Sequence, residues 1–160
     1  MQEVLIFSDG SARGNPGNGG FGALLRYTDA QGRVHERELS QGYQLTTNNR
    51  MELLGVIRAL QELKRPCKVR VQTDSKYVVD AFNQHWIEGW KRRGWKSAKK
   101  DPVANRDLWE ELLAAMDGHE VAFTWIKGHA GHVENERCDA LATAAADGDA
   151  LIADEGYVAG

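Results

Sequence analysis

The sequence predicts a single α/β domain in which helices cover the two faces of a mixed β-sheet. Its length of 160 residues suits one domain. The first third of the chain contains strand-like segments separated by turn residues, which favours antiparallel pairing. Later segments with helical periodicity alternate with short strands, and a helix between two strands favours parallel pairing.

The first third is expected to form three antiparallel strands. Residues 4–8 are an apolar run typical of a central strand that is covered on both faces. Residues 21–27 and 34–43 are expected to be the next two strands, joined by turn residues at 29–32. We expect the glycine-rich stretch between the first two strands, residues 10–20, to be a loop.

The rest of the chain adds helices and two further strands, so that residues 1–160 form one domain. An apolar stripe from Leu53 to Leu63 predicts an amphipathic helix, which Pro66 ends. The acidic tail, residues 147–160, has no clear period and is expected to be irregular. The expected helices cover residues 49–64, 74–82, 107–116 and 134–146, and the expected strands cover residues 68–73 and 121–126.

The composition is that of an ordinary globular protein. Hydrophobic residues make up 42% of the chain and charged residues 27%, which excludes disordered and fibrous classes. No apolar run approaches the ~20 residues of a membrane span, and no signal peptide is visible. The two cysteines, Cys67 and Cys138, lack CxxC spacing, which fits a reducing compartment. We therefore expect a cytoplasmic protein, and the net charge of −3 by itself indicates no polyanionic partner.

Two predicted strands each deliver an aspartate at their carboxyl end. Asp9 follows the first strand, and Asp74 follows the strand at 68–73. Ligands of α/β sheets bind outside the carboxyl ends of strands, so adjacent parallel strands would bring Asp9 and Asp74 together. Nearby carboxylates repel each other and need a shared proton or a cation. Each aspartate taken alone is equally well explained as a turn or helix cap.

Two further acids lie beside the buried faces of predicted helices. Glu52, in the first turn of the helix at 49–64, flanks the apolar stripe and is in a position to point across the end of the sheet. The alternative is a capping box, in which Asn49 is the N-cap and Glu52 is the third helical residue. Asp139 lies next to the buried stripe of the last helix, where an acid is unusual.

The loop after the last strand offers a proton carrier. His129 lies in this glycine-rich loop, which suits proton transfer, and the alternative is a surface or helix-entry residue. No Cys or His residues accompany it at zinc-ligand spacing. If the four carboxylates converge, their hard oxygen atoms favour Mg²⁺ or Mn²⁺.

One segment concentrates positive charge and tryptophan. Residues 83–100 contain six basic residues and a single acid, Glu88, and they hold three of the five tryptophans. Cations interleaved with aromatic rings suit a nucleic-acid backbone, because they can contact phosphates and sugars or bases. The alternative is a solvated amphipathic helix whose tryptophans pack inward. The residues concerned are Trp86, Trp90, Lys91, Arg92, Arg93, Trp95, Lys96, Lys99 and Lys100.

Five motifs, in this order, resemble type 1 ribonuclease H in its bacterial form with a basic protrusion. The match extends to about residue 146, and its motifs are FSDGSARGNPGNGG, TTNNRMEL, TDSKYV, WIEGWKRRGW and KGHAGHVENERCDALA. The resemblance implies a mixed five-stranded sheet, with three antiparallel and two parallel strands, flanked by helices. It also implies an endoribonuclease that hydrolyses the RNA strand of RNA/DNA hybrids and leaves 5′-phosphate and 3′-hydroxyl ends.

The resemblance further implies a two-metal mechanism. The four acids Asp9, Glu52, Asp74 and Asp139 would hold two Mg²⁺ ions, with Mn²⁺ as a possible substitute. Asp9 would bridge the two ions. Asp139 would complete the site of the nucleophilic water, and Glu52 and Asp74 would complete the other site. His129 would move protons during water activation or product release.

Contacts with the hybrid are also implied by the resemblance. Leu45 departs from the family pattern, because an arginine often stands there, so the grip on the DNA phosphate is weaker or is made by Arg50 or another residue. We expect a monomer with no obligatory protein partner. The residues near the RNA strand would be Asn15, Asn48 and Gln72. Thr47 and Asn105 would hold a phosphate of the DNA strand. Those along the path of the DNA strand would be Trp86, Lys91 and Trp109, in addition to Trp90, Arg92, Arg93 and Trp95 of the basic segment.

Two other functions fit parts of the sequence. A non-catalytic hybrid-binding module on the same fold would explain the basic segment but not the four acids and His129. A relative with another substrate, such as a resolvase, integrase or exonuclease, would explain the acids but not the basic segment or the loop around His129.

Overall fold

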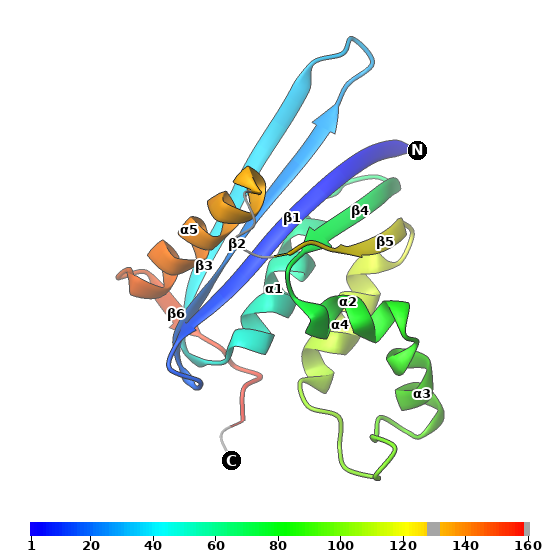
Figure 1. Cartoon of the computed structure of the whole chain (residues 1–160), viewed down its shortest axis with the longest axis vertical. Helices are drawn as coiled ribbons and strands as arrows, with labels where there is room; N and C mark the ends of the chain where they lie inside the picture. The colour runs from blue at the N-terminus through cyan, green and yellow to red at the C-terminus, as the bar shows by residue number, and fades with distance from the viewer. Residues whose placement is uncertain (128–131, 159–160) are drawn as a thin grey trace.

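The computed structural model describes residues 1–127 and 132–158, which form one mixed sheet with helices on both of its faces (Figure 1). The described part of the sheet has six strands in the order β5-β4-β1-β2-β3-β6. The strands are β1 (Gln2–Arg13), β2 (Gly17–Thr28), β3 (Val34–Thr46), β4 (Cys67–Thr73), β5 (Glu120–Trp125) and β6 (Leu151–Ala153). The helices are α1 (Asn48–Gln61), α2 (Lys76–Asn83), α3 (Trp86–Arg92), α4 (Arg106–Met116) and α5 (Val133–Asp147).

The pairing of the strands confirms the mixed sheet. β1, β2 and β3 form an antiparallel meander, as the short turns between them predict. β4 pairs parallel to β1 and β5 pairs parallel to β4, as expected for strands reached through helices. The strand count exceeds the expected five by one, because β6 pairs parallel to β3.

The helices divide the core into two layers. α1 packs on β1 and β2 from one face, with α4 against it, and α5 packs on β1, β2 and β3 from the other face (Figure 1). Successive side chains of β1 point alternately into the two layers. Ile6 packs in the core on the α1 face, and Phe7 packs with Cys138 of α5 on the other face. Burying a side chain of this size contributes about 1.5–3 kcal/mol. None of the helices in the described residues is long and apolar enough to cross a membrane.

The glycine-rich stretch is not the loop that we expected. β1 continues to Arg13 and β2 begins at Gly17, so residues 10–20 form the turn end of the β1–β2 hairpin. Glycine in this stretch allows the helix α5 to pack closely against the strands. A Cβ at Gly20 would lie 2.6 Å from the carbonyl oxygen of Ala142, so the helix α5 could not lie on a larger residue at that position.

The acidic tail is also more ordered than predicted. Residues Leu151–Ala153 add the strand β6 to the edge of the sheet, and Asp154, the next residue, is buried against α1. A three-residue strand is too short to produce a period, and its order comes from contacts with residues far away in the sequence.

Candidate active site

The register of β1 and β4 places Asp9 and Asp74 side by side. Ser8 and Thr73 are the last pair of the parallel ladder, so Asp9 and Asp74, the residues that follow them, lie side by side, although Asp9 lies within β1 and not after it as predicted. Asp9 is only 5% exposed, and its Oδ1 accepts a hydrogen bond from its neighbour's backbone N–H at 2.9 Å. The N-cap of α2 is Ser75, so the alternative of Asp74 as the helix cap is wrong.

α1 carries Glu52, just after its first turn, over β1 beside Asp9 and Gly10. Thr47 is the N-cap, and its hydroxyl accepts a hydrogen bond from the Arg50 N–H at 3.3 Å, so the alternative capping box between Asn49 and Glu52 is wrong. α1 can lie this close to β1 because residue 10 of the strand is a glycine. A Cβ at Gly10 would lie 2.5 Å from the backbone nitrogen of Glu52.

The helix α5 brings Asp139 to the same place from the other face of the sheet. Gly22 of β2 pairs with Asp9, and a Cβ at Gly22 would lie 2.3 Å from the carbonyl oxygen of Cys138. The helix therefore lies directly on the strands at this point. As a result, the carboxylate of Asp139 comes close enough to Asp9 to interact with it electrostatically.

Asp9, Glu52 and Asp74 form a compact group that we call the carboxylate cluster. One oxygen atom from each residue lies within 4.8 Å of the others. Burial, followed by the charges of Asp74 and Asp139, raises the pKa of Asp9 to about 8. Burial and the charges of Asp9 and Asp74 also raise the pKa of Glu52 well above its usual value. The chain alone therefore holds protons here at neutral pH that isolated carboxyl groups would release.

The carboxylate cluster fits a divalent cation. Oε2 of Glu52 is buried and has no hydrogen-bond partner among the described residues. A buried oxygen without a partner costs free energy, and a bound cation would offset that cost together with the repulsion between the carboxylates. Carboxylate oxygens are the ligands that Mg²⁺ and Mn²⁺ prefer. The carboxylate cluster can therefore bind a metal ion.

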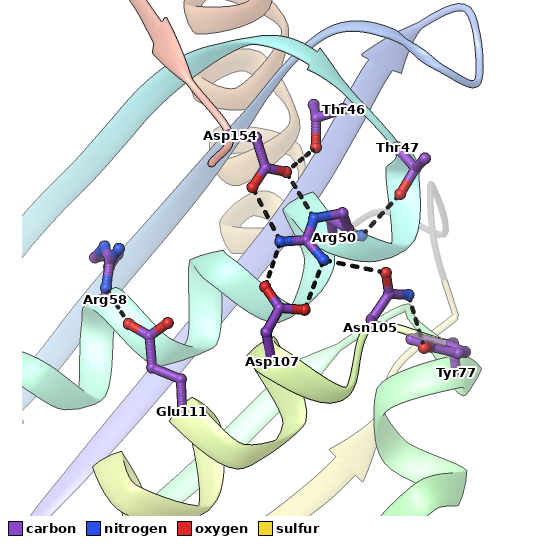
Figure 2. A network of polar contacts seen from close by, with 9 residues as sticks. All are labelled: Thr46, Thr47, Arg50, Arg58, Tyr77, Asn105, Asp107, Glu111 and Asp154. Carbon is purple, nitrogen blue, oxygen red and sulfur yellow. Dashed lines mark hydrogen bonds and ion pairs between the residues drawn. The ribbon is translucent and has the colours of Figure 1, made fainter. Parts of the chain in front are cut away.

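A second buried charged group lies two residues earlier in α1, and Figure 2 shows it. We call it the Arg50 network, formed by Arg50, Asp107 and Asp154. The five N–H groups of the Arg50 guanidinium donate to Asp154, Asp107 and Asn105 at 2.7–3.3 Å. Burial alone would lower the pKa of Arg50, but the hydrogen bonds with the two aspartates outweigh burial and raise it. In the same way, the Arg50 guanidinium lowers the pKa of Asp107.

Four of the predicted hybrid-binding residues lie around the start of α1. The backbone N–H of Asn48 donates to Asn15 at 3.1 Å, and the side chain of Asn48 accepts from a β1 N–H at 2.7 Å, which joins the β1–β2 turn to the helix. Thr47 caps the helix, and Asn105 donates to the hydroxyl of Tyr77 at 3.0 Å (Figure 2). These contacts fix polar side chains at one place on the surface.

The basic segment combines both sequence interpretations. Lys91, Arg92 and Arg93 are exposed, as a phosphate-binding surface requires. The tryptophans pack against one another, since the ring of Trp90 lies 6.4 Å from that of Trp86 and 6.3 Å from that of Trp95. Trp86 remains 37% exposed, whereas Trp90 and Trp95 are half-buried. The cations are thus exposed, whereas Trp90 and Trp95 pack against the hydrophobic core.

Three of the predicted site residues need comment. Trp109 is fully buried and donates to the Tyr77 hydroxyl at 3.1 Å, so the prediction that it lines the path of the DNA strand is wrong, and it packs beneath that surface instead. Gln72 is half-buried within β4. His129 lies outside the described residues.

Two functional features escaped the sequence reasoning. The Arg50 network was missed because Asp154 belongs to a tail without periodicity, and Arg50, named as a residue that could hold the DNA phosphate, instead gives all five of its N–H groups to protein partners. Trp125 was also missed. It stands at the end of β5, and a large exposed aromatic residue at a strand end beside a candidate loop is the signal that could have identified it.

The fold and the carboxylate cluster together define a class, the metal-dependent enzymes whose acids converge at the carboxyl ends of adjacent strands. Residues 1–147 match the family model described as RNase H. The Ribonuclease H of Lachnoclostridium phytofermentans is 56% identical over 153 residues, which cover 95% of this chain and 97% of that relative. The chain therefore belongs to the RNase H family, whose members are metal-dependent hydrolases of the RNA strand in RNA/DNA hybrids.

Solved structures agree with this assignment. The crystal structure of a type 1 RNase H with the type 2 active-site motif superposes with a TM-score of 0.81 and 35% identity, covering 91% of this chain and 72% of that one. A second similar structure is LC11-RNase H1 in complex with an RNA/DNA hybrid, with a TM-score of 0.65 and 26% identity, covering 90% of this chain and 96% of that one.

Proposed function

We propose that the carboxylate cluster and Asp139 hold two Mg²⁺ ions with which this chain hydrolyses the RNA strand of RNA/DNA hybrids, leaving 5′-phosphate and 3′-hydroxyl ends. The observation that carries the proposal is the carboxylate cluster, with its 4.8 Å spacing and the raised pKa of Asp9. Two divalent cations ~4 Å apart stabilise the attacking and leaving oxygen atoms of an in-line displacement.

Each acid has a role that its position supports. Asp9, which interacts with both Asp74 and Asp139, would help to hold both ions. Glu52 and Asp74 would hold one ion together with Asp9, and Asp139, which reaches Asp9 from the opposite face of the sheet, would help to hold the ion that activates the nucleophilic water. The role of His129 in moving protons rests on the family motif alone.

Two surfaces are proposed to bind the hybrid. The polar group around the start of α1, formed by Asn15, Thr47, Asn48 and Asn105, contacts the two backbones near the carboxylate cluster. The exposed cations Lys91, Arg92 and Arg93 contact phosphates of the DNA strand. The similar RNase H1 that was crystallised with an RNA/DNA hybrid supports this substrate. Contacts to 2′-hydroxyl groups would discriminate RNA from DNA.

The chemical proposal is tested with three duplexes of one sequence, an RNA/DNA hybrid, a DNA duplex and an RNA duplex, each with one end label per strand. We expect Mg²⁺-dependent scission of the RNA strand of the hybrid only, and complete loss of scission in EDTA. Binding without scission in Mg²⁺ or Mn²⁺ would contradict the proposal and support a non-catalytic module. Cleavage of the DNA duplex with the hybrid intact would indicate a relative with another substrate.

The binding surface is tested by replacing Lys91, Arg92 and Arg93 with alanine together. We expect KM for the hybrid to rise much more than kcat falls, and the slope of log Kd against log salt to decrease by about 2–3, because each lost phosphate contact removes roughly 0.9. The matched control is the triple alanine variant of Lys64, Arg65 and Lys68, which removes the same charge near the opposite end of β4. Equal slopes in the two variants would show that the basic segment does not contact the hybrid backbone.

We further propose that the chain acts as a cytoplasmic monomer. The two cysteines, Cys67 and Cys138, are free and buried, which suits a reducing compartment.

A further inference from the structure

Trp125 contacts the segment that carries Asp74. It ends the edge strand β5, pairs with Thr73, and is 43% exposed. Its indole N–H donates to the backbone carbonyl of Asp74 at 3.1 Å, and the backbone N–H of the next residue, Ile126, donates to the carbonyl of Thr73 at 2.9 Å. The end of β5 therefore fixes two consecutive carbonyl groups at the point where β4 gives way to Asp74.

This contact acts where the ladder of the sheet has ended. β4 ends at Thr73 and α2 begins at Lys76, so Asp74 lies in a two-residue connection. The backbone angles of that connection decide where the carboxylate points. A hydrogen bond to the Asp74 carbonyl restricts those angles, as partners outside the ligand sphere commonly do for metal ligands.

The ring of the same tryptophan holds a cation. The ammonium group of Lys76 lies 4.7 Å from the centre of the Trp125 ring, within the range of a cation–π interaction. Lys76 is the first residue of α2, where the positive end of the helix dipole disfavours a cation. A lysine that breaks this local rule beside a carboxylate cluster points to a functional role for its charge.

We infer that Trp125 is a positioning residue with two separable effects. Its N–H orients Asp74 and thereby strengthens binding of the divalent cation, and its ring holds the Lys76 ammonium at the rim of the site, where this ammonium binds a phosphate of the nucleic acid. Only the second effect, phosphate binding by Lys76, rests on the proposed function, because binding of the divalent cation can be measured without a nucleic acid.

Two variants separate the effects. Trp125→Phe keeps an aromatic face for Lys76 but lacks the N–H donor, and Lys76→Met keeps the length of the side chain but removes its charge. In calorimetric titrations of Mn²⁺ into the protein without nucleic acid, we expect the Kd of Trp125→Phe to rise about tenfold and that of Lys76→Met to change less than about twofold. In hybrid binding, we expect Lys76→Met to lower the salt slope by about 1, whereas Trp125→Phe keeps the wild-type slope.

Trp86→Phe is the matched control, because Trp86 is exposed to a similar degree and lies on α3 away from β5. It should bind Mn²⁺ like the wild type. Trp125→Tyr, which also lacks the indole donor, replaces Trp125→Phe if the latter does not fold. Wild-type Mn²⁺ affinity in a folded Phe or Tyr variant would overturn the inference. Failure of the wild type to cleave hybrids, with Mn²⁺ binding intact and sensitive to Trp125, would instead count against the proposed function alone.

Discussion

The carboxylate cluster and the Arg50 network are both buried groups of charge, and both depend on the N-terminal part of α1, where Arg50 and Glu52 lie two residues apart. In the Arg50 network, one cation lies between two anions and all five of its donors are hydrogen-bonded (Figure 2). In the carboxylate cluster, three acids face one another, and one Glu52 oxygen has no partner among the described residues.

The difference shows how a chain separates structural from functional charge. The Arg50 network is satisfied by the protein itself, so its ionised form is the stable one and it holds the fold together. The carboxylate cluster is incomplete without a cation, so it costs stability in the metal-free chain and gains it when metal binds. The following variants test this contrast, from the largest expected effect to the smallest.

Asp9→Asn is expected to lower kcat for hybrid cleavage by at least about a thousandfold. Asp9 lies between the other acids, and metal ions contribute several kcal/mol of transition-state stabilisation, with each 1.36 kcal/mol equal to a factor of ten. Single-turnover cleavage of a labelled hybrid in Mg²⁺ provides the measurement. Asp147→Asn, the same change at an exposed ion pair, is the control and should keep wild-type activity. Comparable rates for the two variants would remove Asp9 from the mechanism.

Arg50→Met is expected to destabilise the protein by about 3–5 kcal/mol, because it leaves the carboxylate of Asp154, which is 5% exposed, buried without its cation. Thermal unfolding should show a Tm lower by about 10 °C. A loss of less than about 1 kcal/mol would mean that the Arg50 network does not stabilise the fold.

The same Asp9→Asn change that abolishes activity is expected to stabilise the metal-free protein above neutral pH. Because the pKa of Asp9 is raised to about 8 in the folded state, folding binds a proton that the unfolded chain has released, and stability falls as the pH rises from about 4 toward 8. Asparagine removes this dependence. In EDTA, Tm of the variant should match the wild type near pH 4 and exceed it by about 10 °C at pH 8.5, because each unit of raised pKa is equivalent to about 1.36 kcal/mol.

Addition of Mg²⁺ should reverse that order. The ion binds the folded wild type and raises its Tm with concentration, whereas the Asn variant should gain much less. If the wild type were more stable than Asp9→Asn at pH 8.5 in EDTA, this result would contradict the repulsion assigned to the carboxylate cluster.

Arg13→Met is expected to have the smallest effect. Arg13 pairs with Asp147 at 2.6 Å, but the two side chains are 49% and 52% exposed. Water screens such a pair, and ordering two long side chains offsets the attraction. We expect Tm to remain within about 1 °C of the wild type, compared with about 10 °C for Arg50→Met. A similar loss in both variants would show that burial does not distinguish these two arginines.

The sequence predicted the parts of the site that depend on local patterns. Asp9 and Asp74 follow strands whose hydrophobic patterns are visible, and the helix between those strands indicates their parallel pairing, so their meeting at one sheet end was foreseeable. Glu52 was ambiguous, because a first-turn glutamate also fits a capping box, and the choice depends on which residue caps α1.

Other parts depend on contacts that no local pattern encodes. Gly10 was predicted to lie in a loop and Gly22 in a strand, and neither pattern showed that the absent Cβ lets α1 and α5 lie against the strands at these two positions. The family resemblance placed Trp109 along the path of the DNA strand, but the packing of Trp90 and Tyr77 around it buries it. The strand β6 is too short to be recognised, and it exists because β3 offers an edge to pair with.

The pairing of Arg50 with Asp154 has a consequence for the order of assembly during synthesis. The two residues are separated by 104 positions, so the ribosome makes Arg50, Glu52 and then Asp107 before Asp154, the second anion that pairs with Arg50, exists. Closing so long a loop is entropically costly and slow. The meander and α1 can therefore form early in synthesis. The part of α1 that carries Arg50 and Glu52 gains its ion pair with Asp154 only after β6 has left the ribosome.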